Sequence, residues 1–200
     1  GNFNADNCLV GGRTMDYGPF GFIDKYDPKF AKWVGSGDHF AFAAQPAAAH
    51  ANYVTLAKAL LPLFDDPAPL RRIIEESRPA FVKATADTFR RKLGFSARGD
   101  ERAAARWKAL EPLLRGLDYT IFFRQLAKAA TSQDAVGAVA SSFYGDVDEG
   151  ALGAWLDAWK RALDDAGDLR SAPERLLAEN PKYVLREWML VEAYEAAKKN

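Results

Sequence analysis

Residues 151–163, with the sequence ALGAWLDAWKRAL, carry the clearest helical pattern in this chain. Their large apolar side chains recur at the spacing that places them on one face of an α-helix. These side chains belong to Leu152, Trp155, Leu156, Trp159 and Leu163. A face this rich in tryptophan and leucine is stable only when other elements cover it. The stretch therefore predicts a helical domain with an aromatic core.

From about Pro28 to the end of the chain, apolar segments of this helical kind alternate with Gly, Pro and Asp. Asp118 has the position of a helix cap before YTIFFRQLAKAA, and Gly94 that of a helix stop. Ser171 and Glu174 have the spacing of a capping box. Helices are expected over 53–64, from Pro79 to Leu93, over 107–114, 119–130 and 152–163, from Ser171, and from Pro181 onward, the last burying Val184, Trp188, Val191 and Tyr194.

The composition limits the possible functions. The chain has 200 residues and 48% hydrophobic content, enough for one well-buried domain or one large lobe of a bigger protein. Lys+Arg and Asp+Glu both number 27, so no net charge attracts nucleic acid or an anionic membrane. Cys8 is the only cysteine, which excludes an internal disulfide and a cysteine-based zinc site. The apolar runs are too short and interrupted for a transmembrane helix, so we do not expect an integral membrane protein.

Residues 1–24 differ from this helical pattern because they are rich in glycine and contain short β-type runs. CLV and RTM flank Gly11-Gly12, and a two-residue connection of two glycines is a strong signal of a β-hairpin. If Gly11 and Gly12 are the two central turn residues, Leu9 faces Thr14, Cys8 faces Met15 and Asn7 faces Asp16. We therefore expect a short N-terminal hairpin with Asn7 and Asp16 side by side at its open end.

The polar residues at this end suit a hard divalent cation and a proton acceptor. Directly opposed residues have Cβ atoms roughly 4.5–5.5 Å apart, close enough for Asn7 and Asp16 to share a Mg²⁺ or Mn²⁺ ion. Such an ion commonly takes few protein oxygens and completes its shell with water and substrate phosphate. Asp6, next to the pair, is placed to accept a proton from an attacking hydroxyl. The alternative is structural: Asp6 and Asn7 form a turn, and Asp16 caps the segment that follows.

The stretch DYGPFGF at 16–22 favours the catalytic interpretation. Gly18 follows Asp16 and an aromatic residue, so the backbone there can approach a ligand closely. The order Asp-Asn, hairpin, Asp-aromatic-Gly parallels protein kinases, in which the Asn and the second Asp hold Mg²⁺ against the nucleotide phosphates. Here Asn7 follows Asp6 directly, a tighter spacing than in ordinary kinases. The layout is kinase-like without being a standard kinase signature.

These motifs resemble the selenoprotein O family of kinase-fold protein adenylyltransferases. The most specific part of the resemblance is NADN at 4–7 followed by DYGPFGFIDKYDP at 16–28. Further stretches resemble family segments in the same order, namely FAAQP, LAKALLPLF, DYTIFFRQL and NPKYVLREWML. The resemblance therefore covers nearly all of the chain.

The resemblance implies a mainly α fold, the helical C-terminal lobe of a protein-kinase-like fold with a short β-hairpin at its N-terminal end. Residues 1–27 would form the active-site hairpin and metal-binding loop, and residues 28–200 a single helical lobe. Asp6 would be the catalytic aspartate, Asn7 and Asp16 the metal ligands, and Asp16 and Gly18 contacts of the bound nucleotide. The family's ATP-binding lobe would precede Gly1, so this part alone is expected to be inactive.

The activity that the resemblance implies is transfer of AMP from ATP to Ser, Thr or Tyr hydroxyls of proteins, with Mg²⁺ or Mn²⁺ as cofactor. Its partners would be ATP and protein substrates. The compartment would be the mitochondrion of a eukaryote, with the chloroplast or a bacterial cytoplasm as alternatives. A second hypothesis is a catalytically inactive helical subunit that serves as a scaffold or docking protein in a larger assembly. Phosphoryl transfer by an ordinary kinase fits the Asp-Asn spacing less well.

Overall fold

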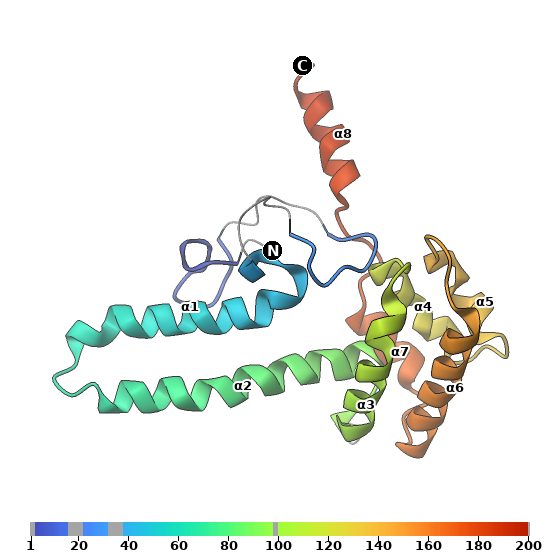
Figure 1. Cartoon of the computed structure of the whole chain (residues 1–200), viewed down its shortest axis with the longest axis horizontal. Helices are drawn as coiled ribbons and strands as arrows, with labels where there is room; N and C mark the ends of the chain where they lie inside the picture. The colour runs from blue at the N-terminus through green and yellow to red at the C-terminus, as the bar shows by residue number, and fades with distance from the viewer. Residues whose placement is uncertain (1–2, 16–21, 32–37, 98–99, 200) are drawn as a thin grey trace. The chain divides into compact units, whose positions relative to one another are not determined.

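The computed structural model describes residues 3–15, 22–31, 38–97 and 100–199, and these ranges are mainly helical (Figure 1). This confirms the mainly α class. The helices are α1 Gln45–Leu60, α2 Ala68–Lys92, α3 Asp100–Leu110, α4 Tyr119–Ala129, α5 Ala135–Val139, α6 Glu149–Asp165, α7 Ala172–Glu179 and α8 Glu187–Ala197. Within the described ranges, β structure is limited to isolated bridges, so the expected hairpin of two strands does not form there.

The chain folds as two compact units. The N-unit consists of Gly1–Phe20 and Asp27–Thr85, and the C-unit consists of Gly21–Tyr26 and Ala86–Asn200. The division falls within α2, whose last residues belong to the C-unit. The domain boundary expected between residues 27 and 28 stays a prediction.

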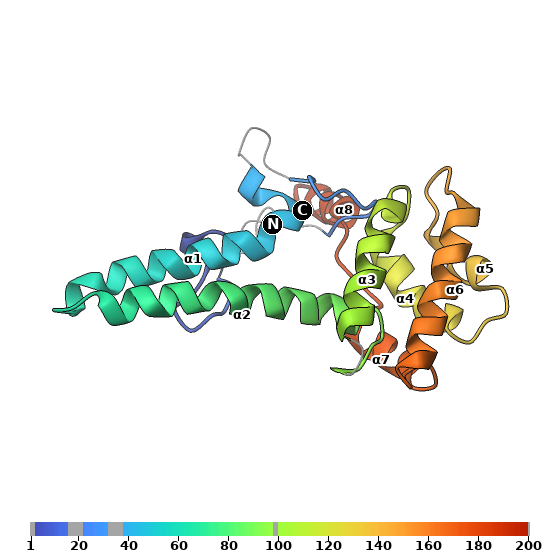
Figure 2. The same cartoon turned by 60° about the horizontal axis from the view of Figure 1, so that its bottom comes forward.

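In the N-unit, α1 and the first part of α2 are neighbours in both views (Figures 1 and 2). His50 of α1 has its Nε2 3.1 Å from Oγ of Ser77 in α2. Its ring lies edge-on to the ring of Phe81, with centroids 5.3 Å apart. The residues that α1 buries are small, Ala48 and Ala57. Small and aromatic side chains therefore make the contact between these two helices.

The C-unit contains the hydrophobic core, around which α3, α4, α5, α6 and α7 gather (Figures 1 and 2). The face predicted for α6 is buried as expected, and the Nε1 of Trp159 donates a hydrogen bond of 2.9 Å to the Leu93 carbonyl. The Nε1 of Trp155 likewise donates to the Arg106 carbonyl at 2.9 Å. Among the described residues, the largest fully buried side chains all belong to the C-unit: Trp159, Phe95, Phe122, Phe123, Leu93, Leu110, Leu114, Leu117, Leu126, Leu152, Leu156 and Leu163.

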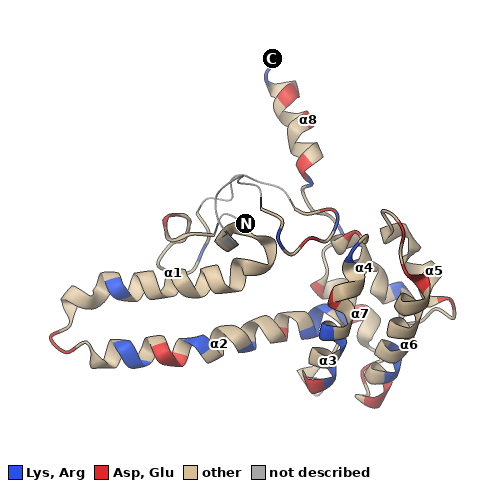
Figure 3. Cartoon of the chain, in the orientation of Figure 1, with Lys and Arg blue, Asp and Glu red and all other residues tan. Residues whose placement is uncertain are grey.

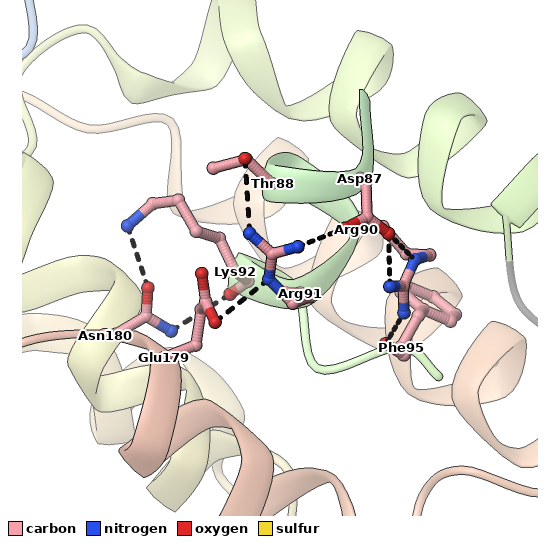
Figure 4. Close-up of polar contacts among 8 residues, drawn as sticks. All are labelled: Asp87, Thr88, Arg90, Arg91, Lys92, Phe95, Glu179 and Asn180. Carbon is pink, nitrogen blue, oxygen red and sulfur yellow. Dashed lines mark hydrogen bonds and ion pairs between the residues drawn. The ribbon is translucent and has the colours of Figure 1, made fainter. Parts of the chain in front are cut away.

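The basic last turn of α2 ties this helix to the end of α7 (Figures 3 and 4). Nε of Arg91 donates to Oε2 of Glu179 at 3.1 Å. Nζ of Lys92 donates to Oδ1 of Asn180 at 2.9 Å, and Nδ2 of Asn180 donates to the Lys92 carbonyl at 3.1 Å. Gly94 follows with a φ of +81°, the left-handed conformation that stops the helix as predicted. Polar side chains therefore connect the end of α2 to the end of α7, at a point where α2 already lies against the core.

Some local predictions fail for identifiable reasons. α2 runs through Pro79, where a helix start was predicted. A proline removes only one backbone N–H donor, and the helix-forming residues on both sides of Pro79 keep their own backbone hydrogen bonds. The cap predicted at Asp118 is confirmed, since its Oδ1 accepts from the Ile121 N–H at 2.8 Å. The capping box predicted at Ser171 is absent. Ser171 has helix-like angles of φ −100° and ψ −4° instead of the extended ones of an N-cap, and its side chain makes no cap bond.

The last helix, α8, begins at Glu187 and buries none of its residues. The prediction that its apolar side chains are buried is wrong, since Trp188 is 54% exposed and Tyr194 60% exposed. A periodic pattern identifies an apolar stripe, but it does not show whether another element covers that stripe. Among the helices of the described ranges, none combines the length and apolar character needed to cross a membrane.

Candidate active site

The catalytic aspartate predicted at position 6 lies in a short 3₁₀ turn, Ala5–Asn7. Asn4 caps this turn, because its Oδ1 accepts a hydrogen bond from the Asp6 N–H at 3.1 Å. The Asn4 carbonyl accepts a second bond, from the Asn7 N–H at 3.1 Å. Asp6 is exposed, whereas Asn7 is buried with 8% of its surface accessible. The local sequence thus places an accessible carboxylate directly beside a residue that packing holds in place.

The backbone pairing after this turn differs from the predicted register by one residue. Cys8 pairs with Thr14 instead of Met15, and the Met15 N–H donates to the Asn7 carbonyl at 2.8 Å. A two-residue type I′ turn needs positive φ at both central residues. Gly12 has a φ of +82°, whereas Gly11 is not left-handed. The connection therefore includes Val10, Gly11 and Gly12, with the Gly12 N–H donating to the Leu9 carbonyl at 2.8 Å.

The change of register removes the argument that placed Asn7 opposite Asp16. Asp16 and Gly18 lie outside the described residues. Their assignment as metal ligand and nucleotide contact therefore stays a prediction that rests on the sequence motif.

The described part of the site fits a hard cation by the chemistry of its donors. Asp6 and Asn7 offer carboxylate and amide oxygens, the donor type that Mg²⁺ and Mn²⁺ prefer. In the described ranges no group of three or more His, Cys, Asp or Glu side chains gathers to enclose a metal. A cation that completes its shell with water and substrate phosphate needs only a few protein oxygens. Residues 6 and 7 match that requirement in donor type.

A cavity of about 410 Å³ lies between the Ala5–Asn7 turn and α1 within the N-unit. Ala5 and Cys8 line it, whereas Asp6 does not. Nδ2 of Asn52 in α1 donates to the Phe3 carbonyl at 3.3 Å and so ties the chain before the turn to this helix. The rest of the lining is mostly apolar: Leu9, Val10, Gly12, Ala49, Tyr53, Thr55, Leu56, Ala59 and Phe81. The contact of Asn52 is one that no sequence motif had indicated.

The segment that follows the predicted metal loop is held by other residues of the C-unit. The Phe22 N–H donates to the Leu185 carbonyl at 2.9 Å. Asp24 and the buried Asp118 both accept hydrogen bonds from the guanidinium of Arg186. From the sequence, Asp118 was expected to cap a helix, and the stretches around Asp118 and Arg186 resembled family segments, but neither residue was expected to have a role in the site. That Arg186 is the common partner of Asp24 and Asp118 becomes evident only when the chain is folded.

Comparison with known protein families matches residues 1–200 to the family described as protein adenylyltransferase SelO. Similar curated proteins include the protein nucleotidyltransferase YdiU of Xanthomonas campestris pv. campestris (strain 8004), which is 33% identical over 206 residues. Proteins of the same name from Aromatoleum aromaticum (strain DSM 19018 / LMG 30748 / EbN1) and Stutzerimonas stutzeri (strain A1501) are 36% identical over 208 residues and 35% identical over 203 residues.

These matches cover almost all of this chain but a minor part of each relative. They include 98%, 98% and 100% of the chain in the three cases. The same matches include 40%, 39% and 40% of the relatives. The chain therefore spans about 40% of the length of the curated relatives it matches.

Proposed function

This chain belongs to the protein adenylyltransferase SelO family, and we propose that it supplies the catalytic aspartate and the metal ligands of such an enzyme. The proposed reaction moves AMP from ATP to a Ser, Thr or Tyr hydroxyl of an acceptor protein. The hydroxyl oxygen forms a bond to the α-phosphorus of ATP, and the bond from this phosphorus to the bridging oxygen breaks. Pyrophosphate leaves, and the remainder of the ATP site would be supplied from outside these residues.

The observation that carries this proposal is the capped turn with an exposed Asp6 beside a buried Asn7. Asp6 would take the proton of the acceptor hydroxyl, a role that requires the hydroxyl to come within hydrogen-bond distance of its carboxylate. Asn7 and Asp16 would hold Mg²⁺ or Mn²⁺, which when bound neutralises negative charge on the phosphates. Gly18 would allow the backbone to approach the nucleotide closely.

Labelled ATP tests the reaction class in the full-length protein that contains this chain. We expect radioactivity from α-labelled ATP to appear on an acceptor protein, and radioactivity from γ-labelled ATP to be absent. The reverse pattern would identify an ordinary kinase and reject AMP transfer. The transferred group is confirmed by the mass that it adds to the acceptor.

Variants of the proposed site test its residues. Asp16→Ala is expected to abolish transfer because it removes a metal ligand, and Asp6→Asn to slow it by about 10²–10⁴-fold because it removes the proton acceptor. Asp65→Ala, which removes an exposed carboxylate elsewhere in the N-unit, is the matched control and should transfer AMP at the wild-type rate. Unchanged labelling by the Asp16→Ala protein would reject its assignment as a metal ligand.

An inactive docking subunit is the second candidate, and the exposed apolar face of α8 favours it. Trp188, Val191 and Tyr194 are exposed on that helix, as expected for a surface that binds another protein. This candidate predicts no labelling from either form of ATP. It also predicts that Asp6→Asn leaves association with the partner unchanged, whereas Trp188→Ala weakens it.

A further inference from the structure

The C-unit contains a cavity of about 780 Å³ that includes none of the proposed active-site residues. Most of its walls come from α4, from α7 and from residues 181–189, which include the start of α8. Its volume lies within the range of roughly 300–1,000 Å³ that is typical of ligand sites. Tyr183 and Trp188 on its wall are 80% and 54% exposed, so the cavity is open to solvent.

The charged side chains of this cavity are basic. Arg124 and Lys128 of α4 and Lys182 before α8 line it, and none of its described lining residues is Asp or Glu. Lys128 and Lys182 are exposed, and neither forms an ion pair with a residue that the structure describes. Nζ of Lys182 lies 5.1 Å from the centroid of the Tyr183 ring, a contact with an uncharged group. Both lysines therefore keep their positive charge available.

Arg124 contributes a third positive charge, in a fixed position. Its Nη1 donates to the carbonyls of Leu177 at 2.6 Å and Asn180 at 2.7 Å. These carbonyls carry only partial charges, so most of the guanidinium charge remains uncompensated. Arg186 also lines the cavity, but the carboxylate of Asp118 offsets its charge. The positive charge that the cavity offers to a ligand therefore comes from α4 and from the chain before α8.

Apolar side chains beside these cations are exposed as well. Leu177 is 46% exposed and Met189 39% exposed, and both line the cavity together with Trp188. Grouped apolar side chains on a surface mark sites of interaction, and aromatic, Met and Arg side chains are enriched in protein interfaces. A ligand that suits this cavity must therefore combine negative charge with an apolar group over a short distance.

We propose that this cavity binds an acidic segment of a partner protein. Its carboxylates would pair with the three uncompensated cations, and an apolar side chain of the segment would pack against Trp188 and Met189. A nucleic acid carries a phosphate at every nucleotide and needs cations along an extended path. The exposed Glu192 follows on α8 and would repel such a polyanion, whereas a protein segment needs only a few carboxylates. Binding there requires only the C-unit and does not depend on AMP transfer.

The test uses the full-length protein that contains this chain and a fluorescein-labelled peptide of alternating Glu and Phe, with binding measured by fluorescence anisotropy. Lys182→Glu reverses one free charge, and Trp188→Ala removes a large apolar wall. Lys108→Glu is the matched charge control, because Lys108 is an exposed lysine of α3 that does not line the cavity. Leu185→Ala is the apolar control, because Leu185 is 48% exposed and also does not line it.

We expect Lys182→Glu and Trp188→Ala each to raise the dissociation constant of the peptide at least about tenfold, as truncation of a central interface residue does. Both control variants should bind the peptide as the wild type does. Added salt should weaken binding because it screens the charges. A peptide with Lys in place of Glu should not bind.

Failure of the acidic peptide to bind, or equal losses in the control variants, would reject this cavity as its site. Poly(U) RNA that binds more tightly than the peptide and loses affinity in the same variants would identify a nucleic-acid site instead. AMP transfer is measured separately. Peptide binding with the expected losses but without transfer supports the docking site and rejects the proposed reaction, and transfer without peptide binding does the opposite. If circular dichroism shows that Trp188→Ala is unfolded, the comparison of Lys182→Glu with Lys108→Glu decides.

Discussion

At the scale of single residues, Gly12 shows how one backbone angle changes the geometry expected of a site. Gly12 has a φ of +82°, and in the observed turn Cys8 pairs with Thr14 instead of the predicted Met15. A β-carbon added at Gly12 would meet nothing within 4 Å, so the cost of Gly12→Ala comes from the backbone alone. We expect that variant to destabilise the turn by about 1 kcal/mol, measured as faster exchange of the Met15 amide. Gly11→Ala, also in open space and not left-handed, is the control. Equal effects of the two variants would reject this conformation.

Lys92 provides a prediction of pH dependence. Burial lowers its pKa from 10.5 to about 8, and the nearby Glu179 offsets this only in part. Between pH 8 and 10 the unfolded chain therefore binds this proton more than the folded chain does, so the free energy of unfolding rises with pH. Lys92→Met removes that rise. Denaturant titrations of both proteins at pH 7, 8, 9 and 10 check it: the stability of the wild type relative to the variant should increase from about pH 8 upward. A difference that is constant with pH would contradict the depressed pKa.

At the scale of elements, the helix caps show that a capping sequence does not always form a capping hydrogen bond. Asp148 caps α6, since its Oδ1 accepts from the Ala151 N–H at 2.9 Å. Ser171 has the sequence of a capping box, but it makes no cap bond to α7. We therefore expect Asp148→Ala to lower the free energy of unfolding by about 1 kcal/mol, and Ser171→Ala to lower it by much less. Urea titrations at one pH measure both. A larger loss for Ser171→Ala than for Asp148→Ala would contradict this difference between the two helix starts.

At the scale of the whole molecule, the two units differ in how much core they contain. The fully buried large side chains of the described residues lie in the C-unit, whereas α1 of the N-unit buries only Ala48 and Ala57. Local opening is easiest where little apolar surface is buried. We expect the amides of α1 to exchange at least about tenfold faster than those of α4 and α6 in native-state hydrogen exchange. Trp159→Ala should destabilise the C-unit by about 3–5 kcal/mol. Equal protection of α1 and α6 would contradict this division of stability.

Features that depend on neighbouring residues could be predicted from the sequence alone. The period of α6 predicted its buried face, Asp118 predicted a cap and Gly94 a stop, because each depends on side chains or angles within a turn or two of helix. The order of NADN and DYGPFGF indicated the family, which the comparison with known families confirms. The site roles of Asp6 and Asn7 stay predictions of the same motif. Asp16 and Gly18, outside the described residues, remain predictions of that motif.

Which surfaces are covered, and which distant residues are in contact, could be seen only in the folded chain. The same periodicity that is buried in α6 is exposed in α8, since periodicity does not specify a partner. The junction of Asp24, Asp118 and Arg186 joins residues far apart in the sequence, none of which lies in a motif for ion pairing. Long-range contacts of this kind form when the packing of whole helices brings chain segments together. Their energy depends on burial, and burial is a property of the folded molecule and not of any short stretch of its sequence.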